Sequence, residues 1–351
     1  MRIMFLVAFG CALAGLRSVQ EQESTPAPVR LVEVASGSRQ WTGIALSRSG
    51  RVFVNFPRWS PDVPVSVGEL TEDGTIEPYP NEKWNEWKAD SAPHEHFVCV
   101  QSVHVDGKDR LWILDPANPM FRGVVDGGPK LMQVDLAADE VVRTYAFDPT
   151  IAPRGSYLND VRIDTGTETA FITESGLGAL VVVDLETGNA RRLLDEHAST
   201  QAEEIQVMIG ERPFPARVHA DGVALDADGG WLYYQALTGR TLYRVPTAAL
   251  RDTSLGADGL AAKVERFAKS GVSDGLLFAP EGIYVSALEE GSIKRVSLEG
   301  AVETVIQDDR IVWPDSFARG SDGSVWFTTA QIHLGPKPSS PYRILKIVAR
   351  R

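Results

Sequence analysis

The sequence contains little cysteine and no concentration of positive charge. Only 2 of its 351 residues are cysteine, and the net charge is −12 with no run of Lys or Arg. Nucleic-acid binding requires a basic face, so this composition argues against a nucleic-acid partner. Cys11 lies in an N-terminal apolar run, and if that run is removed no disulfide can form within one chain. We therefore expect Cys99, in the strand-like segment HFVCVQSV, to be a small core residue.

Motifs of several enzyme classes are also missing. The chain has no G-x-S-x-G nucleophile elbow, no phosphate-binding loop and no paired C-x-x-C. It has no amphipathic helix of useful length, and beyond the N-terminus no apolar run is long enough to span a membrane. These absences leave a strand-rich chain without a membrane span.

The N-terminus has the pattern of an export signal. MRIMFLVAFGCALAG combines one Arg, an apolar run and the small-residue triplet Ala12-Leu13-Ala14. We predict a signal peptide over residues 1–14, a flexible polar leader over 15–28 and a single domain over 29–351. The protein is therefore expected to be secreted or periplasmic, and monomeric.

One sequence pattern occurs six times. Each copy has a polar residue, a small residue, an apolar-x-apolar triplet, a turn with Asp or Gly and then an aromatic strand, as in ADGVALDADGGWLYYQ. The polar positions are Thr42, Gln101, Asn159, Asp221, Asp274 and Asp315, which are 59, 58, 62, 53 and 41 residues apart. A regular period of this size is typical of repeat architectures.

The repeat predicts an all-β fold, a six-bladed β-propeller. A second alternating segment follows each copy, such as ALVVVDLETG and SIKRVSLEG, and alternation with β-branched residues favours strands. Blades stacked in a ring bury both faces of each sheet. We expect VRLVEV, residues 29–34, to close the ring by joining the last blade. A two-domain β-sandwich is the alternative, but it does not explain six registered copies.

The six polar positions are predicted to form a ring at one mouth of the central channel. Each would start the innermost strand of a blade, and three of them are carboxylates that repel one another. Bound Ca²⁺ or another divalent cation would relieve this repulsion, and without one at least one Asp should have a raised pKa. The structural alternative is that Asp-Gly forms an ordinary turn capped by the Asp side chain.

The chain resembles the Yellow/major royal jelly protein family along nearly its whole length after residue 40. The resemblance lies in GRVFVNFPRW (50–59), FVCVQSVHVDGKDRLWILD (97–115), YLNDVRIDTGTETAFITESGLGALVVVDLETG (157–188) and WPDSFARGSDGSVWF (313–327). It implies a secreted six-bladed propeller that binds small molecules such as biogenic amines or sterols, with dopachrome isomerisation in some members.

A more distant resemblance is to the senescence-marker/gluconolactonase propellers. It implies a divalent metal held by Asn159, Asp221 and Asp274. Two positions depart from that pattern, because Asp221 stands where those enzymes usually have Asn and Thr42 stands where they have a Glu ligand. The missing carboxylate puts a lactonase-type site in doubt, although Asp315 could supply another.

Further candidate residues lie beside the predicted channel. His219 is two residues before Asp221, and such a pair could perform acid–base chemistry or simply bind backbone. His333 could reach the same mouth. Arg58 and Trp59, in FPRW, could bind an anionic or aromatic ligand. The connection from 191 to 217 has no clear strand and could form a lid.

Two hypotheses about function follow. In the first, an exported propeller binds a small aromatic or amine ligand at the channel mouth, and the ligand-binding residues are Arg58, Trp59, Gln101, Asn159, Asp315 and His333. In the second, the protein is a divalent-metal-assisted hydrolase or isomerase such as a lactonase. Its catalytic residues would be Asp221, Asp274 and His219, with a metal on Asn159, Asp221 and Asp274.

Overall fold

The computed structural model describes residues 29–349, and its strands form four-stranded antiparallel sheets. The first three blades, from the inner strand outward, are β2 (Ile44–Leu46), β3 (Val52–Asn55), β4 (Val67–Leu70) and β5 (Ile76–Pro78); β6 (Ser102–Val105), β7 (Leu111–Asp115), β8 (Lys130–Asp135) and β9 (Glu140–Ala146); and β10 (Leu158–Asp164), β11 (Thr169–Glu174), β12 (Ala179–Asp184) and β13 (Ala190–Leu193).

The other three blades follow the same plan. They are β16 (Ala220–Leu225), β17 (Trp231–Ala236), β18 (Leu242–Pro246) and β19 (Glu265–Ala268); β20 (Leu276–Ala279), β21 (Gly282–Ala287), β22 (Ser292–Val296) and β23 (Val302–Gln307); and β24 (Pro314–Arg319), β25 (Val325–Thr329), β26 (Tyr342–Ala349) and β1 (Val29–Gly37). Short helices, α1 (Glu82–Asn85), α2 (Thr247–Arg251) and α3 (Ala257–Ala261), lie in the connections.

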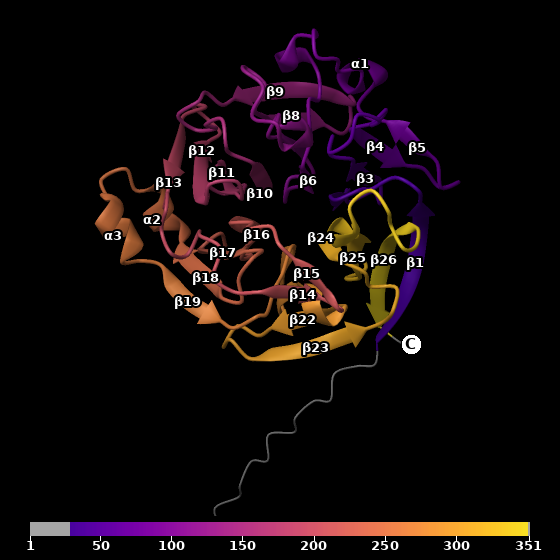
Figure 1. Ribbon diagram of the computed structural model, residues 1–351. Coiled ribbons are helices and arrows are strands. Elements are labelled where there is room, and N and C mark those ends of the chain that lie inside the picture. The colour runs from indigo at the N-terminus through magenta and orange to yellow at the C-terminus, as the bar shows by residue number, and fades with distance from the viewer. Residues whose placement is uncertain (1–28, 350–351) are drawn as a thin grey trace, which may run out of the picture.

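The blades form a closed ring (Figure 1). The innermost strands contact one another in the order β2, β6, β10, β16, β20 and β24, and β24 contacts β2. Strand β1 pairs with β26 from Val29–Ala349 to Gly37–Tyr342. The predicted six-bladed propeller, closed by an N-terminal strand in the last blade, is therefore confirmed. The predicted signal peptide and leader lie outside the described residues.

The hydrophobic core lies between the blades rather than at the centre of the ring. Phe53 of β3 packs with Val103 and Ile113 of the second blade, and Ala224 of β16 packs with Leu276 of the fifth. Strands rich in Val, Ile and Leu suit this packing because both faces of each sheet are covered. Cys99 is fully buried, as predicted. No helix among residues 29–349 is long and apolar enough to cross a membrane.

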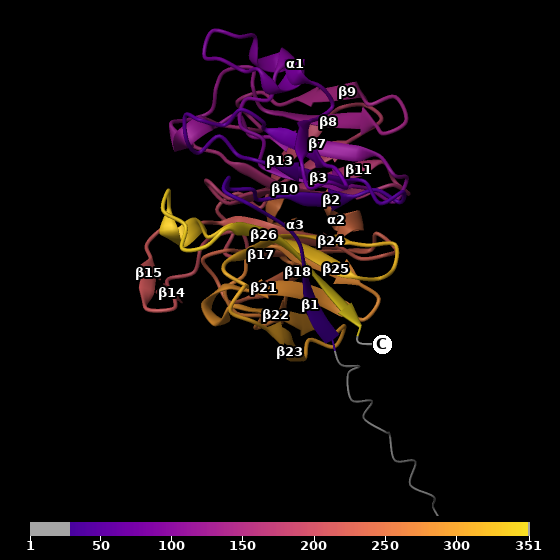
Figure 2. The ribbon, with the colours of Figure 1, turned by 90° about the vertical axis from the view of Figure 1, so that its right-hand side faces the viewer.

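The connection between the third and fourth blades differs from the sequence prediction. Its start belongs to β13, and β14 (Val207–Ile209) pairs with β15 (Arg212–Phe214) in a hairpin on one face of the ring (Figure 2). The backbone NH of Met208 donates to Glu289 of the fifth blade at 3.1 Å. Glu289 also forms an ion pair with Arg240 at 2.7 Å. Strands of three residues are too short to show alternation in the sequence.

Candidate functional site

The six polar positions lie together at the inner ends of the blades, as the repeat predicts. All are buried, with exposed fractions from 0% for Thr42 to 9% for Gln101. In three blades the innermost strand has an irregularity at this position, between Leu158 and Val161, Ala220 and Val223, and Pro314 and Phe317. Asn159, Asp221 and Asp315 are therefore placed where the pairing with the second strand is interrupted.

Hydroxyl groups of second strands form hydrogen bonds with the backbone of three ring residues. Thr173 of β11 donates to the carbonyl of Asp221, and Thr328 of β25 donates to the carbonyl of Thr42. In the fifth blade the hydroxyl of Ser286 accepts from the backbone NH of Asp274 at 2.9 Å. A buried backbone group without such a partner would cost free energy. Second strands thus fix the backbone of three of the six ring residues, in two cases from the preceding blade.

The Asp-Gly pairs reflect close packing between blades, and Asp221–Gly222 lies inside strand β16 rather than in a turn. A Cβ atom on Gly222 would lie 2.1 Å from the carbonyl oxygen of Asp274, and one on Gly275 would lie 1.9 Å from that of Asp315. Only glycine allows this approach. The glycine therefore brings the Asp of each blade next to the Asp of the following blade.

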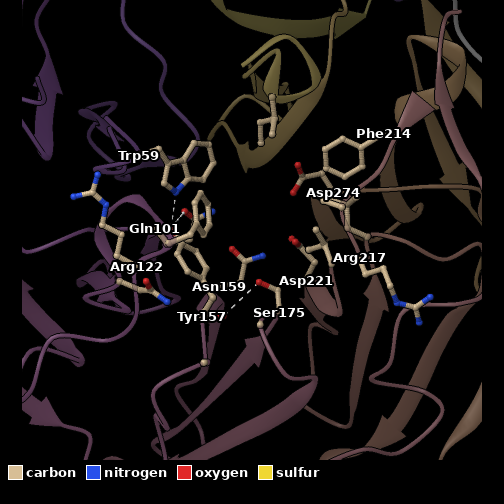
Figure 3. Close-up of a pocket in the computed structure, with 18 of the residues that line it drawn as sticks. Trp59, Gln101, Arg122, Tyr157, Asn159, Ser175, Phe214, Arg217, Asp221 and Asp274 are labelled. Atoms are coloured by element: carbon tan, nitrogen blue, oxygen red, sulfur yellow. Dashed lines mark hydrogen bonds between the residues drawn. The ribbon is translucent and has the colours of Figure 1, made fainter. Parts of the chain in front are cut away.

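A cavity of about 770 Å³ opens at this end of the channel. It is lined by five of the residues singled out in the sequence, Trp59, Gln101, Asn159, Asp221 and Asp274, together with aromatic, aliphatic and arginine side chains. Figure 3 shows Trp59 and Tyr157 on one side and the carboxyl groups of Asp221 and Asp274 on the other. Ligand sites of this kind combine apolar walls with a few polar groups.

The other predicted residues are not among those that line this cavity. Arg58 is 7% exposed, and its Nε donates to the carbonyl of Val98 at 3.1 Å. One carboxylate oxygen of Asp315 accepts from the Ser316 hydroxyl at 3.2 Å. Its other oxygen is buried and has no hydrogen-bond partner among the described residues. A role for Arg58 or Asp315 in binding stays a prediction.

The two predicted histidines each have a partner within the protein. His219 Nδ1 accepts from the backbone NH of Ala202 at 3.1 Å, so the ring is bound to the backbone. The His333 ring stacks on Trp313 with centroids 5.5 Å apart. Burial lowers the pKa of both histidines, which favours neutral rings. The predicted acid–base role of His219 stays a prediction.

The carboxyl groups of the channel interact strongly. Burial raises the pKa of Asp221 well above its usual value, and the charges of Asp274, Asp160 and Asp315 raise it further. Burial likewise raises the pKa of Asp274 to about 7, although a hydrogen bond from Trp313 opposes this. Crowded carboxyls in a buried site cannot all be ionised. The channel therefore retains protons at neutral pH.

Three aromatic side chains stack at the open side of the cavity. Phe121 lies 5.6 Å from Trp59 and 5.1 Å from Tyr157 between ring centroids, and it is 62% exposed. Trp59 Nε1 donates to the Tyr157 hydroxyl at 2.7 Å, and that hydroxyl donates to Gln101 Oε1 at 3.0 Å. We call Trp59, Phe121 and Tyr157 the aromatic stack. It joins loops from three blades into one apolar surface.

The cavity contains oxygen donors of the kind that bind a divalent metal. Asn159, Asp221 and Asp274 present amide and carboxyl oxygens to one space, which is the chemistry that Ca²⁺ accepts. Thr42 does not add a ligand, because its hydroxyl already donates to the carbonyl of Gln101 and accepts from Asn55. Among residues 29–349 no three His, Cys, Asp or Glu side chains are grouped so that they could hold a metal ion.

Sequence reasoning missed several residues of the site. Asp160 adjoins Asn159 and shares the channel with the other carboxyls, but the repeat assigns only one polar position to each blade. Phe121 and Phe214 lie in connections, where no periodicity marks them. Trp313 was the missed residue that the sequence could have indicated. It lies two residues before the ring position in WPDSF, and an indole NH there can reach the ring carboxylate of a neighbouring blade.

The chain was then compared with known proteins. The family model described as "Major royal jelly protein" matches residues 98–320. Major royal jelly protein 5 of Apis mellifera is 25% identical over 228 residues, which cover 60% of this chain and 36% of that protein. Dopaminechrome tautomerase of Drosophila melanogaster is 28% identical over 137 residues, which cover 34% of this chain and 27% of that protein. The matches thus span about a third of these relatives.

The solved structures agree with the fold. A gluconolactonase from Xanthomonas campestris superimposes with a TM-score of 0.59 and 13% identity, covering 92% of this chain and 90% of that one. At this identity the similarity shows the architecture alone. Function has to be argued from the residues of the cavity.

Proposed function

Because this chain belongs to the major royal jelly protein family, we propose that its central cavity binds a small aromatic molecule carrying an amine or a hydroxyl group. The aromatic part of the ligand packs against the aromatic stack. Its polar group enters the buried end and meets Asp221 and Asp274. The fold would then serve as a rigid frame that presents both surfaces to the ligand.

One observation supports this proposal above the others. The aromatic stack and a pair of buried carboxyl groups face each other across the same cavity (Figure 3). Aromatic rings favour planar ligands through stacking, and a carboxylate favours a cationic or hydrogen-donating group. An ammonium group beside Asp274 would favour its ionised form, so that amine binding would release a proton.

The test is calorimetric titration with a panel of aromatic amines and phenols near pH 7. We expect Asp274→Asn to weaken binding of the amines by about tenfold, because it removes a charge-assisted hydrogen bond. The matched control is Asp258→Asn, which changes an exposed carboxylate in helix α3. If no member of the panel binds the unmodified protein, the proposal fails.

A second candidate is an isomerase that works by proton transfer. The supporting observation is that Asp221 and Asp274 lie side by side with raised pKa values, so the pair can both hold and accept a proton near neutral pH. One relative is named as a dopaminechrome tautomerase, which is a proton-transfer enzyme by that name. The test is the rate of loss of quinone absorbance from oxidised dopamine. A rate equal to the uncatalysed one would exclude this activity, and a catalysed rate that Asp274→Asn leaves unchanged would exclude Asp274 as the proton-transfer group.

Metal-assisted hydrolysis is the third possibility, supported by the oxygen donors of Asn159, Asp221 and Asp274. A divalent cation on these side chains, such as Ca²⁺, would polarise a substrate oxygen. Metal analysis of protein purified without chelator tests this. No bound divalent ion, together with no lactone turnover in added Ca²⁺, Mn²⁺ or Zn²⁺, would rule it out.

Export and a monomeric state also belong to the proposal. The support for export is the N-terminal pattern described above, with predicted cleavage after residue 14. N-terminal sequencing of the protein made in an exporting host tests the export and the cleavage site. Sedimentation analysis tests the monomeric state.

A further inference from the structure

Arginine side chains surround the opening of the cavity, although the chain as a whole carries a net charge of −12. Arg122 follows Phe121 in the loop after β7, and Arg154 lies in the loop before β10. Arg217 lies on the opposite side of the cavity from Arg122, in the segment that follows the β14–β15 hairpin (Figure 3). All three side chains line the cavity and are exposed to solvent. The opening is therefore basic while the buried end is acidic.

The three arginines differ in what they bind. Arg217 forms an ion pair with Glu204 at 2.8 Å and donates to the carbonyl of Ala202 at 3.2 Å. Within residues 29–349 Arg122 and Arg154 form hydrogen bonds through their backbone atoms alone, and their guanidinium groups have no acidic partner. Arg154 also passes over Gly123, where a Cβ atom would lie 3.4 Å from its Nε. The backbone NH of Val124 donates to the carbonyl of Arg154 at 3.2 Å, so the two unpaired cations come from loops that meet next to Phe121 of the aromatic stack.

We propose that Arg122 and Arg154 bind a carboxylate on the aromatic ligand, so that the protein selects aromatic acids over the corresponding molecules without the acid group. This inference rests on the proposed function, because it assumes an aromatic ligand in the same cavity. The ring of the ligand packs on the aromatic stack. Its hydroxyl or amine points to the buried carboxyls, and its carboxylate remains at the opening.

The carboxylate of such a ligand and the two arginines have complementary charges. A guanidinium group pairs with a carboxylate through two parallel hydrogen bonds, and it stays charged at every physiological pH. Arg122 and Arg154 need not break an existing ion pair in order to bind a ligand. The reverse orientation is unfavourable, because it would place the carboxylate of the ligand against Asp221 and Asp274.

The experiment uses two pairs of ligands that differ only by a carboxylate, L-DOPA with dopamine and 4-hydroxyphenylacetate with 4-methylphenol. In both acids a phenolic hydroxyl can reach the buried carboxyls while the carboxylate, on the other side of the ring, stays at the opening. Dissociation constants are measured by calorimetry for the unmodified protein and for the double variant Arg122→Gln/Arg154→Gln. We expect the double variant to weaken the acid of each pair by about tenfold and the decarboxylated partner by less than about twofold. Added salt should weaken the acid in the unmodified protein and have little effect in the variant.

The control is Arg30→Gln, which removes one positive charge from the exposed side of β1, the outermost strand of the last blade. It should leave both affinities unchanged. If the unmodified protein binds neither member of either pair, the proposed function fails and this inference fails with it. If it binds the ligands but the double variant weakens both members equally, or neither, then only the inference about Arg122 and Arg154 is overturned.

Discussion

The indole Nε1 of Trp313 donates a hydrogen bond of 2.7 Å to Oδ2 of Asp274. The same indole stacks on His333 and meets the edge of Phe214 at 4.9 Å between centroids. One side chain thus connects the hairpin, the last blade and a carboxyl group of the cavity. Because the bond favours the ionised form of Asp274, it opposes the effect of burial on the pKa of this group.

Replacing Trp313 with Phe should therefore raise the pKa of Asp274. The variant removes the donor and keeps an aromatic ring, so we expect the pKa to rise by about one unit, as for the loss of a hydrogen bond to a charged group. The measurement is the pH at which the affinity for an aromatic amine is half of its maximum. That midpoint should move to higher pH.

The control for this prediction is Trp326→Phe. Trp326 also donates through its indole NH, at 2.8 Å to the hydroxyl of Ser324, but it does not line the cavity. Its replacement should leave the midpoint unchanged. An unchanged midpoint in Trp313→Phe would mean that the bond to Asp274 does not control this titration.

The raised carboxyl pKa values predict that stability falls as pH rises. A carboxyl that titrates near 4 in the unfolded chain and near 7 in the folded one keeps its proton in the folded state across that window. The stabilisation is complete below pH 4 and is lost as pH approaches 7. The free energy of unfolding should therefore fall with pH by about 1.4 kcal/mol per unit for each retained proton.

Urea unfolding of the unmodified protein and of Asp274→Asn at pH 5, 6 and 7 tests this. The comparison between the two proteins matters, because the lowered pKa values of His104, His219 and His333 act in the opposite direction below about pH 6.5. The amide keeps an acceptor for Trp313 but cannot ionise. Parallel pH profiles would show that Asp274 titrates as an ordinary exposed carboxyl.

Most of the fold could be predicted from the sequence because a propeller repeats its local rules. Six polar positions occur in one register, and each stands before an apolar triplet and a turn. This pattern indicates one structural unit that occurs six times. The closing strand could be found because residues 29–34 had no partner in any copy of that unit. The β14–β15 hairpin could not be predicted, because its stability comes from packing on Trp313 and Leu288 rather than from its own pattern.

The glycines of the Asp-Gly pairs give a third prediction. Gly275→Ala should destabilise the protein by more than about 3 kcal/mol, because its Cβ would overlap the carbonyl oxygen of Asp315 at 1.9 Å. Gly256→Ala is the matched control, since a Cβ there meets no atom within 4 Å. Thermal unfolding of both variants measures the effect. Similar midpoints for the two would show that the blades can separate at this point without cost.

The candidate site was less predictable than the fold, because only part of it belongs to the repeat. The ring residues share a register and so appear in the sequence, whereas Phe121, Tyr157 and Phe214 line the same cavity only because their connections converge on one face. Asp160 was missed because an irregularity between Leu158 and Val161 places two consecutive polar residues at the ring, where regular alternation allows one. Arg58 was selected for its neighbours in FPRW, but its guanidinium is bound to the backbone.

Phe121 gives the last prediction, because it is the most exposed member of the aromatic stack. Its side chain contributes little to the core at 62% exposure, so Phe121→Ala should leave the thermal midpoint nearly unchanged. Loss of one aromatic contact should weaken binding of an aromatic ligand by about fivefold. Leu298→Ala, which shortens another exposed apolar side chain on the loop between β22 and β23, should leave affinity unchanged. Equal affinities in all three proteins would place the aromatic ligand away from the stack and against the Phe214 side of the cavity instead.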